Sequence, residues 1–135
     1  MAAETDLARL LAGLQVRVRE GEYVFVTRTG DDAALAASAQ AWLREDEGTT
    51  YVLAREAADA RGLAYDFRAA WLTLGVHSAL QAVGLTAAVA TALAARGIAC
   101  NVLAAFHHDH LLVPAERRDE AVAVLSALAG KAGDR

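Results

Sequence analysis

Apolar residues recur along the chain in short stretches whose spacing predicts helices and strands. The first stretch has the i, i+3, i+4, i+7 spacing of one helix face, and Thr5 stands where a residue could cap its first turn. This helix face is formed by Leu7, Leu10, Leu11 and Leu14. The segment EYVFVTR at 22–28 is β-branched and aromatic and is bounded by turn residues, which predicts a strand.

A second helix and a second strand are predicted to complete the first half of the chain. Asp31 or Asp32 can cap the helix, which ends where acidic residues accumulate at 45–47. Its buried face consists of Leu35, Ala39 and Trp42. TTYVLAR at 49–55 has strand composition, whereas the polar segment 56–68 has no long periodic face. We therefore expect 56–68 to join two halves.

The second half is predicted to contain three strands and two helices. AAWLTLGV at 69–76 alternates as a strand requires, and LTAAVATALAAR at 85–96 forms a helix that Gly97 ends. IACNVLAAF at 98–106 and LLV at 111–113 form a hairpin. The expected buried residues of the hairpin's first strand are Ile98, Cys100, Val102 and Phe106, and those of the last helix are Ala121, Val124, Leu125 and Leu128.

The order of these elements suggests that the two halves are degenerate copies of one small unit. We predict an α+β fold in which two βαββ units, residues 1–66 and 67–135, have helices packed on one side of an antiparallel sheet. Such short elements cannot cover both faces of a sheet, so we expect the remaining face or edge to form a homodimer.

Three segments carry a resemblance to known proteins: HSALQAVGLTAAVATALAARGIACNVLAAFHHDHLLVP at 77–114, GEYVFVT at 21–27 and REDEGTTYVL at 44–53. They resemble a family of small bacterial ACT-domain proteins of unknown function, the first segment its C-terminal half and the other two its first half. The resemblance implies a ferredoxin-like βαββαβ fold in each half. It also implies amino-acid binding where the first strand turns into the first helix, often between two domains. The corresponding loop here is 82–86, in place of the Asp-x-Pro-Gly turn common in metabolic ACT domains.

Composition excludes several classes of partner. The 135 residues carry a net charge of −4, and the 13 basic residues are scattered among 17 acidic ones, so nucleic acid is a poor candidate. No apolar run approaches the roughly 20 residues of a membrane span. The start MAAETDLARL has no signal-peptide pattern, and the single cysteine, Cys100, excludes an intramolecular disulfide. We expect a cytoplasmic protein.

The best candidate for a ligand site is the loop before the helix at 85–96. Glycine at 84 lets a carboxylate approach the unpaired backbone N–H groups at a helix N-terminus, which also carries a positive dipole end. Asn101 could offer an amide to the ligand. The candidate ligand-binding residues are Val83, Gly84, Leu85, Thr86 and Asn101. Alternatively, Gly84 merely turns the chain, Thr86 caps the helix and Asn101 bonds within the sheet edge.

Other groups of polar residues give weaker indications of chemistry. If His108 and Asp109 form a tight turn, His107 and His110 become a cross-strand pair about 5 Å apart at Cβ. Two ligands are too few for a zinc site, so we predict no metal and no cofactor. The adjacent His77 and Ser78 would point to opposite strand faces and form no catalytic pair. We expect the acids at 45–47 to face water and Cys100 to be a core residue.

These observations favour a non-catalytic regulatory module that binds an amino acid or a similar small carboxylate. The alternative is a structural or protein-interaction domain that dimerises and binds no small molecule. A third hypothesis is a small metal-dependent enzyme centred on the histidine turn.

Overall fold

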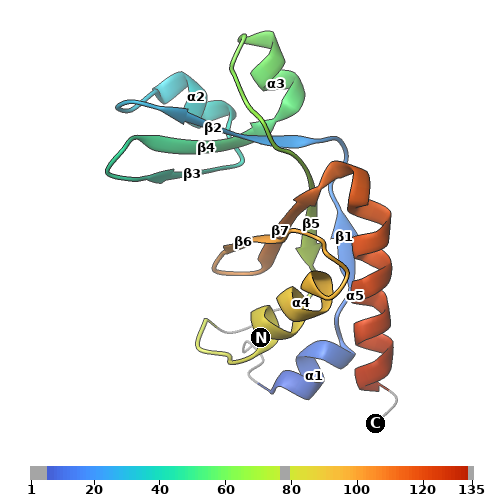
Figure 1. The fold of residues 1–135 in the computed structure, drawn as a ribbon. Helices are drawn as coiled ribbons and strands as arrows, with labels where there is room; N and C mark the ends of the chain where they lie inside the picture. The colour runs from blue at the N-terminus through green and yellow to red at the C-terminus, as the bar shows by residue number, and fades with distance from the viewer. Residues whose placement is uncertain (1–5, 77–79, 134–135) are drawn as a thin grey trace. The chain divides into compact units, whose positions relative to one another are not determined.

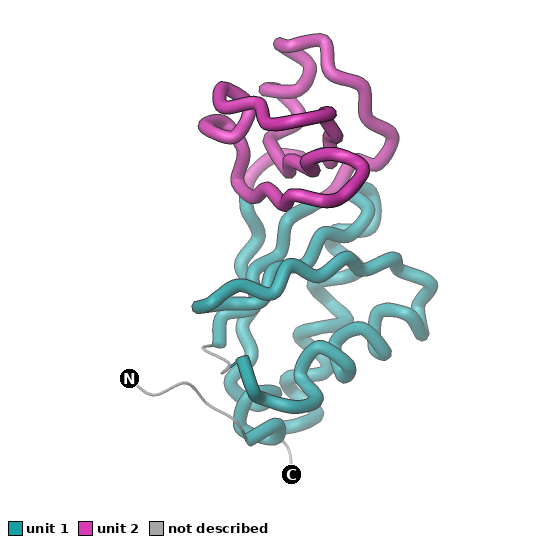
Figure 2. Tube along the Cα trace, turned by 90° about the vertical axis from the view of Figure 1, so that its left-hand side faces the viewer, with its two compact units in different colours: residues 1–19, 70–135 teal, residues 20–69 magenta. Residues whose placement is uncertain are grey.

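The chain forms two compact units (Figure 2). The computed structural model describes residues 6–76 and 80–133 (Figure 1). Unit 1 comprises residues 1–19 and 70–135, and unit 2 comprises residues 20–69. Residues from the beginning of the chain belong to unit 1 because the first strand pairs with a strand far along the sequence. The division into domains 1–66 and 67–135 stays a prediction.

Unit 1 contains a four-stranded sheet with the order β1-β5-β7-β6. β1 runs antiparallel to β5, with Val16 opposite Leu74 and Val18 opposite Leu72. Its strands are β1 (Val16–Val18), β5 (Arg68–Leu74), β6 (Asn101–Ala104) and β7 (Asp109–Pro114). Its helices are α1 (Leu7–Ala12), α4 (Leu85–Ala94), the short 3-10 helix η1 (Ala115–Arg117) and α5 (Arg118–Gly133).

The core of unit 1 lies between one face of this sheet and the helices. Alternate residues of β5 and β7 point to the same face and pack against apolar residues of α1, α4 and α5. The strands contribute Ala70, Leu72, Leu74, Leu111 and Val113, and the helices contribute Leu10, Leu85, Val89, Leu93, Ala121 and Leu125. All of them are nearly inaccessible to solvent.

Unit 2 is built from β2 (Tyr23–Arg28), α2 (Ala33–Ser38), β3 (Ala41–Arg44), β4 (Thr49–Ala54) and α3 (Arg55–Ala60). The strand order is β3-β4-β2, and the first two residues of β5 pair with β2 on its other side. Val24, Val26, Tyr51 and Leu53 of the sheet pack against Leu35 of α2 and Ala58 of α3.

Both units thus have the βαββαβ order that the resemblance implies. In unit 2 the order follows the chain from β2 to the start of β5. In unit 1 it runs β5, α4, β6, β7, α5, and β1 from the beginning of the chain supplies the last strand. The predicted α+β fold of two tandem units with helices on one side of the sheet is confirmed.

The predicted second helix is wrong in its last part. α2 ends at Ser38, and Trp42 lies in β3 with 46% of its surface exposed. Ala39 is extended, at φ −75° and ψ 149°, and the Gln40 N–H donates to the carbonyl oxygen of Val52 at 2.8 Å. Pairing with β4 therefore overrides a local pattern that also fits a helix.

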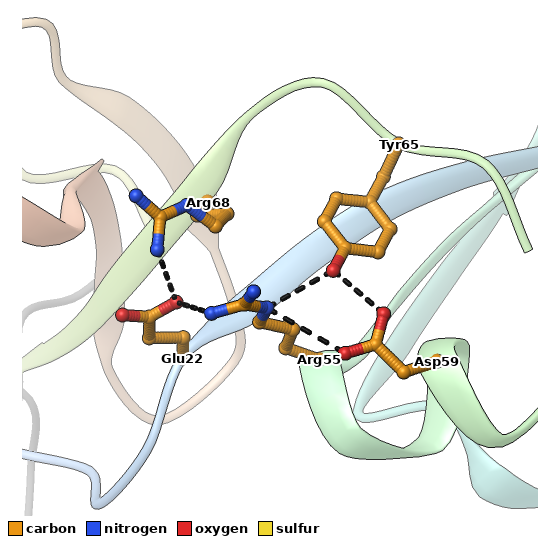
Figure 3. A network of polar contacts seen from close by, with 5 residues as sticks. All are labelled: Glu22, Arg55, Asp59, Tyr65 and Arg68. Atoms are coloured by element: carbon orange, nitrogen blue, oxygen red, sulfur yellow. Dashed lines mark hydrogen bonds and ion pairs between the residues drawn. The ribbon is translucent and has the colours of Figure 1, made fainter.

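The polar segment 56–68, expected to join two halves, lies within unit 2 and contains most of helix α3. The Arg55 side chain donates to Tyr65 Oη and to a Glu22 carboxylate oxygen, both at 3.0 Å, and Arg68 donates to the same Glu22 oxygen at 3.3 Å (Figure 3). Tyr65 Oη in turn donates to Asp59 at 2.6 Å. The charged residues of this segment therefore connect α3 and the start of β5 to the start of β2.

Two other local predictions differ from the structure. Asp6 caps α1, its side chain accepting from the Arg9 N–H at 3.1 Å, whereas Thr5 lies outside the described residues. β6 is shorter than predicted, and Phe106 is 71% exposed in the turn after it rather than buried. Among the described residues, no helix is long and apolar enough to cross a membrane.

Candidate functional site

Helix α4 begins at a glycine that leaves its first turn without a side-chain cap. Gly84 is the N-cap residue at φ 104° and ψ −19°, a left-handed conformation that glycine tolerates far better than other residues. The backbone N–H of Ala88 donates to the Gly84 carbonyl at 2.8 Å, which begins the helical hydrogen bonding. The preceding N–H groups, those of residues 85–87, are the ones that a helix leaves for outside partners.

A cavity of about 130 Å³ lies beside this helix N-terminus, within unit 1. One wall comes from the segment before and at the start of α4, and the other from the end of β6 and the start of β7. The lining residues are Leu80, Ala82, Gly84, Leu85, Thr86, Ala104, Ala105 and Asp109. Three of the five predicted site residues, Gly84, Leu85 and Thr86, thus line one cavity.

The cavity contains one charged lining residue, Asp109. β7 alternates, and Leu111 and Val113 lie in the core beneath the helices, so Asp109 at the start of the strand lies on that same face. Burial raises the pKa of its carboxyl, while the nearby His110 and His108 lower it by a smaller amount. The sequence prediction missed Asp109 as a site residue because it placed this residue in a tight turn.

The structure does not bring the other two predicted residues into the cavity. Val83 is 83% exposed and is not among the lining residues. Asn101 lies at the opposite end of β6 from Ala104, and its amide donates to the Leu112 carbonyl at 3.4 Å. This is the sheet-edge hydrogen bond that the sequence left open as an alternative. Thr86 lies within the first turn and makes no capping bond, so the alternative in which it caps α4 is wrong.

The histidine turn differs from the predicted geometry. Ala104 pairs with Asp109 and Leu103 with His110, so the turn spans residues 105–108 and His107 is not opposite His110. The extra turn residues move Asp109 into the strand. In the described part of the chain, no three His, Cys, Asp or Glu side chains come together as a metal site would require.

His110 belongs to a hydrogen-bonded group on the sheet face away from the helices of unit 1. The Trp71 indole donates to His110 Nδ1 at 3.1 Å, and Thr73 Oγ1 lies 3.0 Å from the same nitrogen. Burial and the positive charge of Arg19 lower the pKa of His110. Because Nδ1 accepts a hydrogen bond, the ring is neutral and has a structural role.

His108 and Cys100 also have structural surroundings. His108 Nδ1 lies 3.0 Å from the Val76 carbonyl oxygen, to which it donates, and this bond connects the turn to the segment after β5. Cys100 is half-buried against the core of unit 1, and this burial raises the pKa of its thiol. His77 and Ser78 lie outside the described residues.

A second hollow, of about 620 Å³, lies in unit 2 and is lined mainly by charged residues. Its lining residues are Glu20, Gly21, Glu22, Ala54, Arg55, Glu56 and Asp59. Arg55 lies between Glu22 at 3.0 Å and Asp59 at 3.6 Å, and hydrogen bonds to Tyr65 and Glu22 raise its pKa (Figure 3). Since Arg55, Glu22 and Asp59 pair with one another, they belong to the network that supports the fold of unit 2.

Comparisons with known proteins agree with this architecture. Two ACT-domain family models match the chain, one over residues 2–70 and the other over residues 67–127. The structure is similar to that of a protein of unknown function from Vibrio cholerae, described as a possible transport protein. The two are 40% identical, with a TM-score of 0.83 over 91% of this chain and 95% of the other. No curated protein matched the sequence.

More distant structures share the fold. The ligand-free regulatory subunit of aspartate kinase from Thermus thermophilus is 10% identical, with a TM-score of 0.61 over 84% of this chain and 95% of that one. E. coli aspartokinase III in complex with aspartate and ADP is 13% identical, with a TM-score of 0.60 over 85% of this chain and 32% of that one. The family models cover both halves of the sequence, and the chain therefore belongs to the ACT-domain family.

Proposed function

We propose that the protein is a non-catalytic regulatory module that binds an amino acid or a similar small carboxylate at the N-terminus of α4. The observation that supports this proposal is the cavity of about 130 Å³ at the start of α4, lined by Gly84, Leu85 and Thr86. The cavity lies at the start of α4, which follows β5, the first strand of the βαββαβ order in unit 1. ACT domains often bind their ligands in this region of the fold.

Backbone groups would recognise the ligand carboxylate. The N–H groups of the first turn point out of the helix N-terminus, and the ten residues of α4 align their peptide dipoles with the positive end at the cavity. Gly84, at φ 104°, provides the left-handed turn from which α4 starts, and the Leu7 side chain occupies the place of its missing side chain. The aliphatic residues Leu80, Ala82 and Ala104 line the rest of the cavity.

A thermal-shift screen of the full chain tests this proposal. Each common amino acid and a set of small carboxylates, including acetate and propionate, would be added at millimolar concentration. A ligand at about 100 times its Kd stabilises the folded state by about 2.7 kcal/mol, which is easily measured as a rise in Tm. If none of these compounds raises the Tm, the proposal is wrong.

A protein-interaction domain remains the second candidate, and one observation favours it. β3 is an edge strand of unit 2, and its neighbouring residues Trp42 and Leu43 are 46% and 66% exposed. Successive strand residues point to opposite faces, so both sides of this edge carry a large apolar group. A homodimer that covers β3 would explain this exposure. Light scattering should then show a dimer at micromolar concentration, which Trp42→Ser weakens; a monomer throughout would contradict this candidate.

A further inference from the structure

The cavity at the start of α4 is small, and one of its lining residues, Asp109, is charged. Its volume of about 130 Å³ is well below the roughly 300–1,000 Å³ of ordinary small-molecule sites. Apart from Asp109, its side chains are aliphatic or, at Thr86, hydroxylic. A ligand held there must be small, and among the described residues that line the cavity the one side-chain charge is negative.

The position of Asp109 is unusual for a carboxylate. It continues the inward-facing row of Leu111 and Val113 in β7, and it is only partly exposed. Removing a carboxylate from water without a cationic partner is unfavourable. The described residues place no Lys or Arg in the cavity wall to offset this cost.

The equivalent position in unit 2 has no charge. Thr49 begins β4 and pairs with Arg44 across the hairpin, as Asp109 begins β7 and pairs with Ala104. Thr49 also faces inward and is 3% exposed. The fold therefore accepts a neutral residue at this position, and the carboxylate is not needed to form the hairpin.

We propose that Asp109 is the specificity-determining residue of the cavity, where its carboxylate accepts hydrogen bonds from the ammonium group of the ligand. This inference rests on the proposed function, in which backbone N–H groups of α4 hold the ligand carboxylate. A carboxylate bound at the helix N-terminus and an ammonium bound at Asp109 together define an α-amino acid. The small volume restricts its side chain to about the size of a methyl group, so the cavity selects alanine-sized amino acids over larger ones.

The test compares two compounds that differ in the ammonium group. L-Alanine and propionate have the same carbon skeleton, and their binding to the full-length protein would be measured by calorimetry and thermal shift. The variants are Asp109→Asn, which keeps the shape but removes the charge, and Asp66→Asn, a matched control at an exposed residue of unit 2. Circular dichroism and a urea unfolding midpoint would establish that each variant is folded.

We expect L-alanine to bind the natural protein at least about ten-fold more tightly than propionate, since hydrogen bonds between charged groups are the stronger ones. Asp109→Asn should abolish this preference, whereas Asp66→Asn should retain it. L-Leucine should bind at least about ten-fold more weakly than L-alanine, because its side chain exceeds the cavity. Equal binding of L-leucine and L-alanine would overturn the size selection.

Two results would overturn the role of Asp109. They are equal binding of L-alanine and propionate by the natural protein, and an unchanged preference for L-alanine in Asp109→Asn. In both cases a carboxylate still binds, so the proposed function survives. If no amino acid or carboxylate binds, the proposed function fails and this inference fails with it.

Discussion

The two units differ at the start of the first helix of their βαββαβ order, which is α2 in unit 2 and α4 in unit 1. In unit 2 the side chain of Asp32 accepts from the Leu35 N–H at 2.9 Å, and the Tyr51 hydroxyl accepts from the Asp32 N–H at 3.0 Å. In unit 1 the same position of the fold is held by Gly84, and no side chain caps the helix. Unit 2 therefore satisfies this helix N-terminus with its own polar groups, whereas unit 1 has a cavity there.

This difference is the reason for proposing the ligand site in unit 1 and not in unit 2. A ligand carboxylate at α2 would have to displace Asp32, which is already bonded and carries the same charge. At α4 it would replace only water. A repeated fold can thus keep one copy for stability and leave the other open for binding.

The largest effect is expected from a substitution that strains the start of α4 in unit 1. Gly84→Val should lower the free energy of unfolding by about 2–3 kcal/mol and abolish any ligand-induced rise in Tm. The reason is that a Cβ at this position, with φ at +104°, would meet Leu7 Cδ2 at 2.9 Å. Urea unfolding with and without amino acids measures both effects.

Gly97→Ala is the matched control for this substitution. Gly97 also has a positive φ, +67°, but a Cβ there meets nothing within 4 Å. It should cost about 1–2 kcal/mol and leave the ligand response unchanged. A rise in Tm on ligand addition that persists in Gly84→Val would contradict a ligand site at the start of α4.

A smaller effect is expected from removing the side-chain cap of α2 in unit 2. Asp32→Ala should lower the free energy of unfolding by about 1 kcal/mol, since the Leu35 N–H loses its acceptor. Thr86→Ala, in the first turn of α4, should change it by less than about 0.5 kcal/mol because Thr86 is exposed and caps nothing. Chemical unfolding of the two variants side by side makes the comparison. Equal losses would mean that α4 is also capped by a side chain.

The smallest effect concerns the pH dependence at Asp109. Burial raises its pKa above the ordinary value of 3.8, so the folded state binds its proton more tightly than the unfolded state does. The resulting destabilisation is complete above the folded-state pKa and disappears as the pH falls through the ordinary aspartate range. Asp109→Asn should therefore be slightly more stable than the natural protein at pH 7, and this advantage should vanish near pH 3. A stability advantage that does not change with pH would exclude this origin.

The sequence predicts best those elements that depend on local pattern. The strand at 49–54 follows from its composition. Helix α4 follows from its apolar face, and its end follows from Gly97, where the Ile98 N–H donates to the Leu93 carbonyl at 3.0 Å. The first turn of α4 was identified as the candidate ligand loop for the same reason, because a glycine before an apolar helical face is visible in the sequence.

The elements that the sequence did not predict depend on distant partners. β1 has three residues, and its strand character comes from pairing with β5, more than fifty positions along the chain. Trp42 joins a strand through β4 although its spacing also fits a helix. Asp109 enters the candidate site because the turn has four residues instead of two. The longer turn changes the register of the hairpin, and the sequence of the turn alone does not reveal its length.

The strand β1 also has a consequence for the order in which the protein folds during synthesis. β1 leaves the ribosome before β5, α4, β6, β7 and α5, with which it forms unit 1. Residues 20–69 contain every strand pairing of unit 2, so this unit can fold while unit 1 is still being translated. Residues 16–18 must wait for their partner, and closing so long a loop slows folding. We therefore expect unit 2 to become resistant to proteolysis first on a nascent chain, and unit 1 only near the end of translation.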